Sequence, residues 1–162
     1  MKCKIWILFF VLILCFPVLA ENNEMENLIS NYYPNHKQIN NEKFIKHVKE
    51  TIGEELKAPT LITADFDGNE LHDYAVILEE QIFVIFRQIS KGEFKPYELR
   101  RQEWVGDFIY EIKPNTVLKQ YDSSHSIKLK YSAIVVIYYL KSSVAYYWDE
   151  ETLIFKELWL SD

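Results

Sequence analysis

From residue 60 onward, apolar and polar side chains alternate in short runs that are separated by turn residues such as glycine, proline and asparagine. Alternation with a period of two is typical of strands that bury one face. The connections are too short for parallel crossovers, so the pattern predicts antiparallel pairing throughout. The expected strands are 61–66, 72–79, 82–89, 94–101, 107–112, 116–121, 126–130, 133–140, 144–149 and 153–160.

For two of these strands the sequence also predicts a position in the sheet. Residues 133–140 are apolar on both faces, which indicates a central strand that is covered on both sides. Pro96 has no backbone N–H to donate, so its strand is expected at an edge. A central strand of this kind requires two layers. We expect an N-terminal helix to cover one face and a folded-over part of the meander to cover the other.

Before residue 60 the period changes to that of a helix. A helix is predicted for residues 41–52, with Asn40 or Asn41 as its N-cap and Gly53 as its end. The preceding residues 21–40 form a polar segment. The sequence therefore predicts an α+β fold that is mainly β, in which an N-terminal helix packs on an antiparallel β-meander in a two-layer, sandwich-like arrangement. One domain, residues 41–162, holds these elements.

The first twenty residues are predicted to be a secretory signal peptide. Lys2 and Lys4 precede an unbroken apolar run, residues 5–16, and residues suited to a cleavage site end the segment at Ala20. The apolar run is too short to span a bilayer comfortably, which disfavours a retained anchor. We expect a periplasmic or secreted protein that has no membrane association after cleavage.

The cysteines indicate how the mature chain is stabilised, and the net charge indicates which partners it can bind. Cys3 and Cys15 both lie in the predicted signal, so the mature chain has no disulfide, and the bulky Leu14 before Cys15 disfavours lipidation. The signal carries two lysines and no acidic residue, so its removal changes the net charge from −6 to −8. This charge argues against nucleic acid or an anionic membrane surface as a partner. A cationic protein or a metal ion fits better.

Candidate metal ligands are concentrated in the turn between the first two expected strands. Asp65, Asp67, Asn69 and Asp73 stand at positions 1, 3, 5 and 9 of this loop, and the Leu71 carbonyl stands at position 7. This spacing lets oxygen ligands converge on a hard cation, so we predict calcium as the cofactor. The alternative is an ordinary acidic turn, because Asp-Gly and Gly-Asn pairs are favoured in hairpins.

The same loop resembles the FG-GAP repeats of integrin-type β-propellers and the related VCBS-like repeats of exported bacterial proteins. Their pattern is approximately D-x-[DN]-x-D-G-x-x-D followed by an apolar strand, and the match covers about residues 60–79. The resemblance implies a calcium-stabilised hairpin. Glu70 stands where the family has glycine, and Val76 stands at position 12, which excludes an EF-hand. A complete propeller is not expected, because the loop has no second copy and the strands are too few for a ring of blades.

Aromatic residues gather near the C-terminus, and cross-strand pairing in the core accounts for them. An open face is the alternative, in which Tyr146, Trp148 and Asp149 form a binding face for a peptide, a sugar or a protein. The full set comprises Tyr138, Tyr139, Tyr146, Tyr147, Trp148 and Trp159.

The sequence favours binding over catalysis. The mature chain has no cysteine nucleophile and no zinc spacing of histidines. Glu103, Asp107 and Glu111 are the available acids for a glycosidase pair, but nothing distinguishes them from surface residues. We predict an exported, calcium-stabilised module that recognises another protein and is not an enzyme. The alternatives are a metal-independent inhibitor or immunity-type protein of the envelope and a small envelope hydrolase.

Overall fold

The computed structural model describes residues 24–40, 42, 45–46, 50, 59–101, 108–138 and 141–161. It divides into two compact units, Met1–His36 and Lys37–Asp162. In the first unit, residues 24–32 form a helix, and the Tyr33 N–H donates to the Ile29 carbonyl at 2.7 Å. In the described part of the chain, no helix is long and apolar enough to cross a membrane. The predicted signal peptide, residues 1–20, lies outside the described residues.

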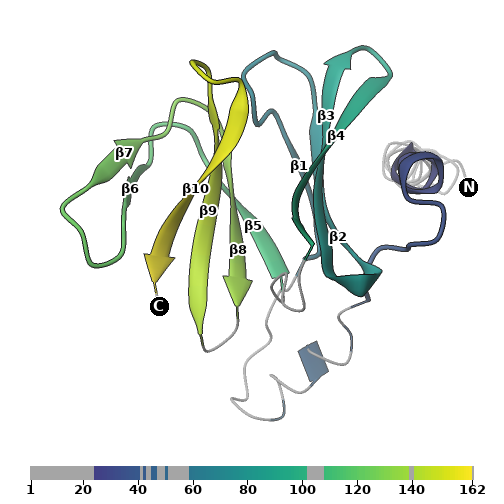
Figure 1. The fold of residues 1–162 in the computed structure, drawn as a ribbon, viewed down its shortest axis with the longest axis horizontal. Coiled ribbons are helices and arrows are strands. Elements are labelled where there is room, and N and C mark those ends of the chain that lie inside the picture. The colour runs from purple at the N-terminus through teal and green to yellow at the C-terminus, as the bar shows by residue number, and fades with distance from the viewer. Residues whose placement is uncertain are drawn as a thin grey trace, which may run out of the picture. The chain divides into compact units, whose positions relative to one another are not determined.

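The second unit consists mainly of antiparallel strands, as predicted (Figure 1). One sheet has the order β1-β2-β3-β4, with β1 at Leu61–Ala64, β2 at Asp73–Leu78, β3 at Ile82–Ser90 and β4 at Glu93–Arg101. The other has the order β10-β9-β8-β5, with β5 at Phe108–Ile112, β8 at Ala133–Tyr138, β9 at Ser142–Asp149 and β10 at Ile154–Ser161. A separate two-stranded ribbon contains β6 (Val117–Lys119) and β7 (Ser126–Lys128), and a short 3-10 helix η1 (Glu79–Gln81) joins β2 to β3.

The predicted positions of two strands are confirmed. Pro96 lies in β4, which is an edge strand of its sheet. Strand β8 lies between β9 and β5, and its side chains are buried on both faces. The described strands form no closed propeller, in agreement with the sequence.

The cover of β8 differs from the expectation in one respect. Ile134 and Val136 face a core shared with the first sheet, whereas Val135 packs with residues of the β6–β7 ribbon such as Leu118. Among the described residues, the β6–β7 ribbon therefore packs on the outer face of β8. Of the predicted helix 41–52, the described residues 42, 45, 46 and 50 are helical, and the other positions lie outside the described residues.

The main core lies between the inner faces of the two sheets. The Phe83 ring of β3 contacts the Tyr146 ring of β9 edge to face, with the ring centroids 5.5 Å apart. Contacts of this kind join two sheets of alternating sequence into a sandwich. The buried residues of this core are Ala64, Phe66, Ala75, Ile77, Phe83, Ile85, Ile109, Ile134, Val136, Tyr138, Val144 and Tyr146.

The backbone around β1 fixes the position of the acidic loop. Ala64 at the end of β1 pairs with Asp73 at the start of β2, which closes the chain between them into a loop. On the other side of β1, the Ile109 N–H of β5 donates to the Pro59 carbonyl at 2.9 Å. The loop therefore connects β1, which is an edge strand, to β2, which pairs with both β1 and β3, and its ends are held by the sheet.

Candidate metal centre

Three predicted ligands meet in the loop between β1 and β2. Carboxylate oxygens of Asp65, Asp67 and Asp73 all lie within 4.8 Å of one another. Asp73 is fully buried, Asp67 is 7% exposed and Asp65 is half-buried. Three carboxylates at this separation, largely shielded from water, repel one another, and a cation would relieve that repulsion. The cluster could therefore hold a metal ion, as the sequence predicted.

Asp65 organises the turn of the loop. Its two carboxylate oxygens accept hydrogen bonds from the backbone N–H groups of Gly68 at 2.7 Å, Asn69 at 3.2 Å and Glu70 at 3.0 Å. Gly68 and Glu70 both have left-handed backbone conformations, with φ of 80° and 66°. Glu70 thus adopts the conformation for which the FG-GAP pattern has glycine, and the hydrogen bonds to Asp65 hold it there against an intrinsic steric cost.

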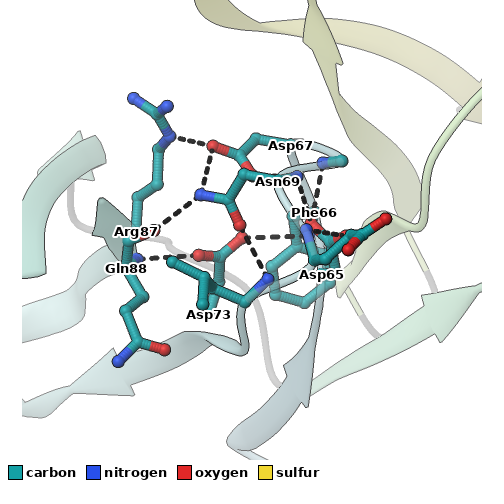
Figure 2. Close-up of polar contacts among 10 residues, drawn as sticks. Asp65, Phe66, Asp67, Asn69, Asp73, Arg87 and Gln88 are labelled. Atoms are coloured by element: carbon teal, nitrogen blue, oxygen red, sulfur yellow. Dashed lines mark hydrogen bonds and ion pairs between the residues drawn. The ribbon is translucent and has the colours of Figure 1, made fainter. Parts of the chain in front are cut away.

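Asp73 joins the loop to β3. One carboxylate oxygen accepts from the Phe66 N–H at 2.9 Å, and the other accepts from the Gln88 N–H at 2.8 Å (Figure 2). Burial raises the pKa of Asp73 to about 7, although these two hydrogen bonds favour the charged form; the neighbouring charges of Asp67 and Asp65 raise the pKa further. The buried carboxyl of Asp73 therefore keeps its proton up to near-neutral pH.

A basic side chain already reaches the cluster. The Arg87 side chain extends from β3 and forms an ion pair with the carboxylate of Asp67 (Figure 2). The guanidinium of Arg87 also lies over the Trp148 ring of the opposite sheet, 4.7 Å from the ring centroid. Arg87 therefore supplies one positive charge to the cluster and links it to the aromatic core.

Asn69 lies beside the three carboxylates and holds the loop to β3. The Asn69 side-chain oxygen accepts from the Leu71 N–H at 2.8 Å, and its Nδ2 donates to the Gln88 carbonyl at 2.7 Å (Figure 2). The same Nδ2 donates to Asp67 at 3.3 Å. In this arrangement Asn69 holds the loop to β3 and orients Asp67. Among the predicted ligands, the structure brings together the three carboxylates of Asp65, Asp67 and Asp73.

The loop contacts the second sheet through a tyrosine. The Tyr131 ring lies so close to Gly68 that a Cβ atom at this glycine would overlap it. The Tyr131 hydroxyl donates to the Glu150 carboxylate at 2.5 Å, and the Lys130 ammonium donates to the same carboxylate at 2.6 Å and 2.7 Å. The acidic loop is therefore in contact with the segment before β8 and, through it, with the β9–β10 turn.

The aromatic binding face expected at Tyr146, Trp148 and Asp149 is divided between the interior and the surface. Tyr146 is 3% exposed and Trp148 is 9% exposed, and the Trp148 ring packs on Phe155 with the centroids 5.0 Å apart. Asp149 is half-buried and forms an ion pair with Lys156. Tyr146 and Trp148 therefore contribute to the core, which is the interpretation that the sequence favoured for the aromatic set.

Of the three acids considered for catalysis, Glu111 is the one that lies within the described residues. Glu111 accepts a hydrogen bond from the Ser132 hydroxyl at 2.7 Å and pairs with Lys113 at 2.5 Å. Glu103 and Asp107 lie outside the described residues, as does Tyr139 of the aromatic set.

Sequence reasoning missed Arg87, Gln88 and Tyr131, although all three contact the loop. One signal was available, because Arg87 and Gln88 interrupt the otherwise apolar run of β3. A charged residue within such a strand indicates a buried partner of opposite charge. Tyr131 carried no comparable signal, since its contact depends on how the two sheets pack.

Comparison with known protein families, with curated proteins and with solved structures finds no match for this chain. The resemblance to FG-GAP repeats therefore stays a prediction that rests on the spacing of the loop. Any function has to be argued from the geometry of the chain itself.

Proposed function

We propose that the protein is an exported binding module in which a calcium ion stabilises the β1–β2 loop beside a surface that recognises another protein. The observation that carries this proposal is the convergence of Asp65, Asp67 and Asp73 within 4.8 Å. All three offer hard oxygen ligands, and calcium accepts such ligands in flexible geometry, with water completing the coordination. The net charge expected after removal of the signal also favours a cation.

The β9–β10 turn supports a protein as the partner. Leu153 is 62% exposed and Ile154 is 49% exposed, and both follow the acidic Glu150 and Glu151 closely in sequence. Exposed apolar side chains near an acidic residue are suited to a protein surface with an apolar pocket and a basic group beside it. Because Glu150 accepts from Tyr131, which contacts the loop, an ordered loop would also fix this turn.

Thermal unfolding of the purified protein with calcium and then with a chelator tests the metal part of the proposal. We expect a higher melting temperature in calcium, because the ion binds the folded loop and not the unfolded chain. The variant Asp65→Ala should lose this calcium-induced rise, whereas Glu79→Ala, which removes an exposed acid outside the loop, should retain it. An equal rise in both variants would show that calcium acts elsewhere.

A second candidate is the metal-independent inhibitor or immunity-type protein, and Arg87 favours it. All the carboxylate oxygens of the cluster accept hydrogen bonds from protein donors, and Arg87 supplies a positive charge to Asp67. A loop balanced in this way is ordered without calcium. In that case the melting temperature is the same in calcium and in chelator, and the acidic surface binds a cationic target with an affinity that falls as salt is added.

A further inference from the structure

A pocket of about 660 Å³ lies outside the acidic loop, between the β6–β7 ribbon and the end of β9. One wall contains residues 127–131, and the other contains residues 147–151. Its volume falls within the range of about 300–1,000 Å³ that is typical of small-molecule sites. Tyr147 and Ile127 supply apolar lining, and both also pack on the core under the ribbon, so their positions are fixed by the fold.

Most charges around this pocket are already neutralised. At one end, Glu150 accepts hydrogen bonds from Lys130 and from the Tyr131 hydroxyl, which join the two walls. Asp149 pairs with Lys156. A pocket with these internal pairs is preformed, and it offers neither a net positive field for an anion nor an unbalanced group of carboxylates for a cation.

Two charged side chains of opposite sign are left for a ligand. Lys128 and Glu151 line the pocket from opposite walls, and both are exposed. Within the part of the chain that the structure describes, neither side chain forms a hydrogen bond or an ion pair. Lys128 can donate hydrogen bonds and Glu151 can accept them. The charges of Lys128 and Glu151 cancel, so this pair suits an uncharged ligand that carries both hydrogen-bond acceptors and donors.

We propose that this pocket binds a neutral saccharide. A sugar ring presents an apolar face of C–H groups that can lie on the Tyr147 ring, and its hydroxyl groups can accept from Lys128 and donate to Glu151. This activity goes beyond the proposed recognition of a protein and does not depend on calcium. An exported protein would meet such ligands outside the cytoplasm.

The backbone of the neighbouring turn determines where Glu151 lies. Leu153 has a left-handed conformation with φ of 54°, which is costly for a leucine. The turn is held by the Asp149 carboxylate, which accepts from the N–H groups of Glu151 at 2.9 Å and Thr152 at 3.3 Å. These hydrogen bonds fix Glu151 at the wall of the pocket.

The test is a titration of the purified protein with neutral oligosaccharides of glucose, N-acetylglucosamine, galactose and mannose, followed by the NMR shifts of backbone amides. We expect at least one series to shift residues 127–131 and 147–151 at millimolar concentration. The titration is run in calcium and in chelator, and the shifts should be the same in both. A failure of the calcium proposal would therefore leave this result unaffected.

Variants of the lining residues assign the shifts to the pocket. Tyr147→Ala and Lys128→Gln should each weaken binding by about tenfold, the effect of losing one good contact. Tyr110→Ala is the matched control, because Tyr110 is 40% exposed and does not line the pocket. Lys128→Gln keeps the test decisive if Tyr147→Ala fails to fold. The proposal is overturned if no saccharide shifts these residues, if Lys128→Gln binds like the wild type, or if triglycine shifts them and saccharides do not.

Discussion

Protonation of Asp73 should make the stability of the protein depend on pH in opposite directions with and without calcium. The Asp73 carboxyl is fully buried, and its pKa is raised from 3.8 to about 7. Without calcium, the folded state therefore retains a proton that the unfolded chain releases above about pH 4. The contribution of Asp73 to stability is fully present below this pH and is lost as the pH rises towards 7.

The size of the effect follows from the pKa difference. A shift from 3.8 to about 7 corresponds to roughly 4 kcal/mol of unfolding free energy, because each unit contributes about 1.4 kcal/mol. Calcium reverses the sign, since the ion competes with the proton for the carboxylate and binds more tightly as the proton leaves. In calcium, the contribution of this site should increase between about pH 5 and pH 8.

Urea unfolding of the wild type and of Asp73→Asn, from about pH 4 to pH 8, measures this contribution. The asparagine cannot titrate, and its amide NH₂ would face one of the two N–H donors of Phe66 and Gln88. The variant should therefore lose about 1–3 kcal/mol relative to the wild type near pH 4, where the Asp73 carboxyl is protonated in the folded state. In chelator, the difference between wild type and variant should shrink as the pH rises. A difference that stays constant would show that Asp73 is ionised throughout and would refute the reasoning.

Three further substitutions test the loop and the core. In urea unfolding, Gly68→Ala should destabilise the protein by more than Gly92→Ala. Both glycines have positive φ, but only Gly68 has a neighbour, Tyr131, in the space that the added Cβ would occupy. Equal losses of stability would mean that the Tyr131 ring moves away freely. Glu70→Gly should stabilise the protein in chelator by about 0.5–1 kcal/mol, since it relieves a left-handed glutamate; a loss would show that the Glu70 side chain stabilises the loop. Trp148→Ala should destabilise by about 3–5 kcal/mol in the same assay, because the ring is buried between Arg87 and the core, and a variant of unchanged stability would contradict its assignment to the core.

The strands could be predicted because alternation is a local property of the sequence. The expected run 72–79 became β2 at Asp73–Leu78, and the expected edge position of Pro96 followed from one missing N–H. The division into two sheets could not be predicted in this way. Strand β5 pairs with β8 and not with its neighbour β6, and periodicity contains no information about such a choice.

The candidate site could also be predicted only in part. The spacing of Asp65, Asp67 and Asp73 brought these side chains together as expected, because a short loop between paired strands leaves them little freedom. The role of Asn69 could not be foreseen, since its side chain is turned towards the Gln88 carbonyl of β3. The sequence of the loop alone cannot predict contacts with β3, because this strand comes later in the chain.

The pairing of β5 with β8 has a consequence for the order of folding. Ile112 pairs with Ala133, so the whole segment between them, which contains the β6–β7 ribbon, has to close into a loop when this pair forms. The β8–β9–β10 and β2–β3–β4 hairpins require only short connections and carry a smaller entropic cost of loop closure. We therefore expect the two meanders to form early, and β5 to be the last strand to dock, completing the second sheet in the slowest step of folding.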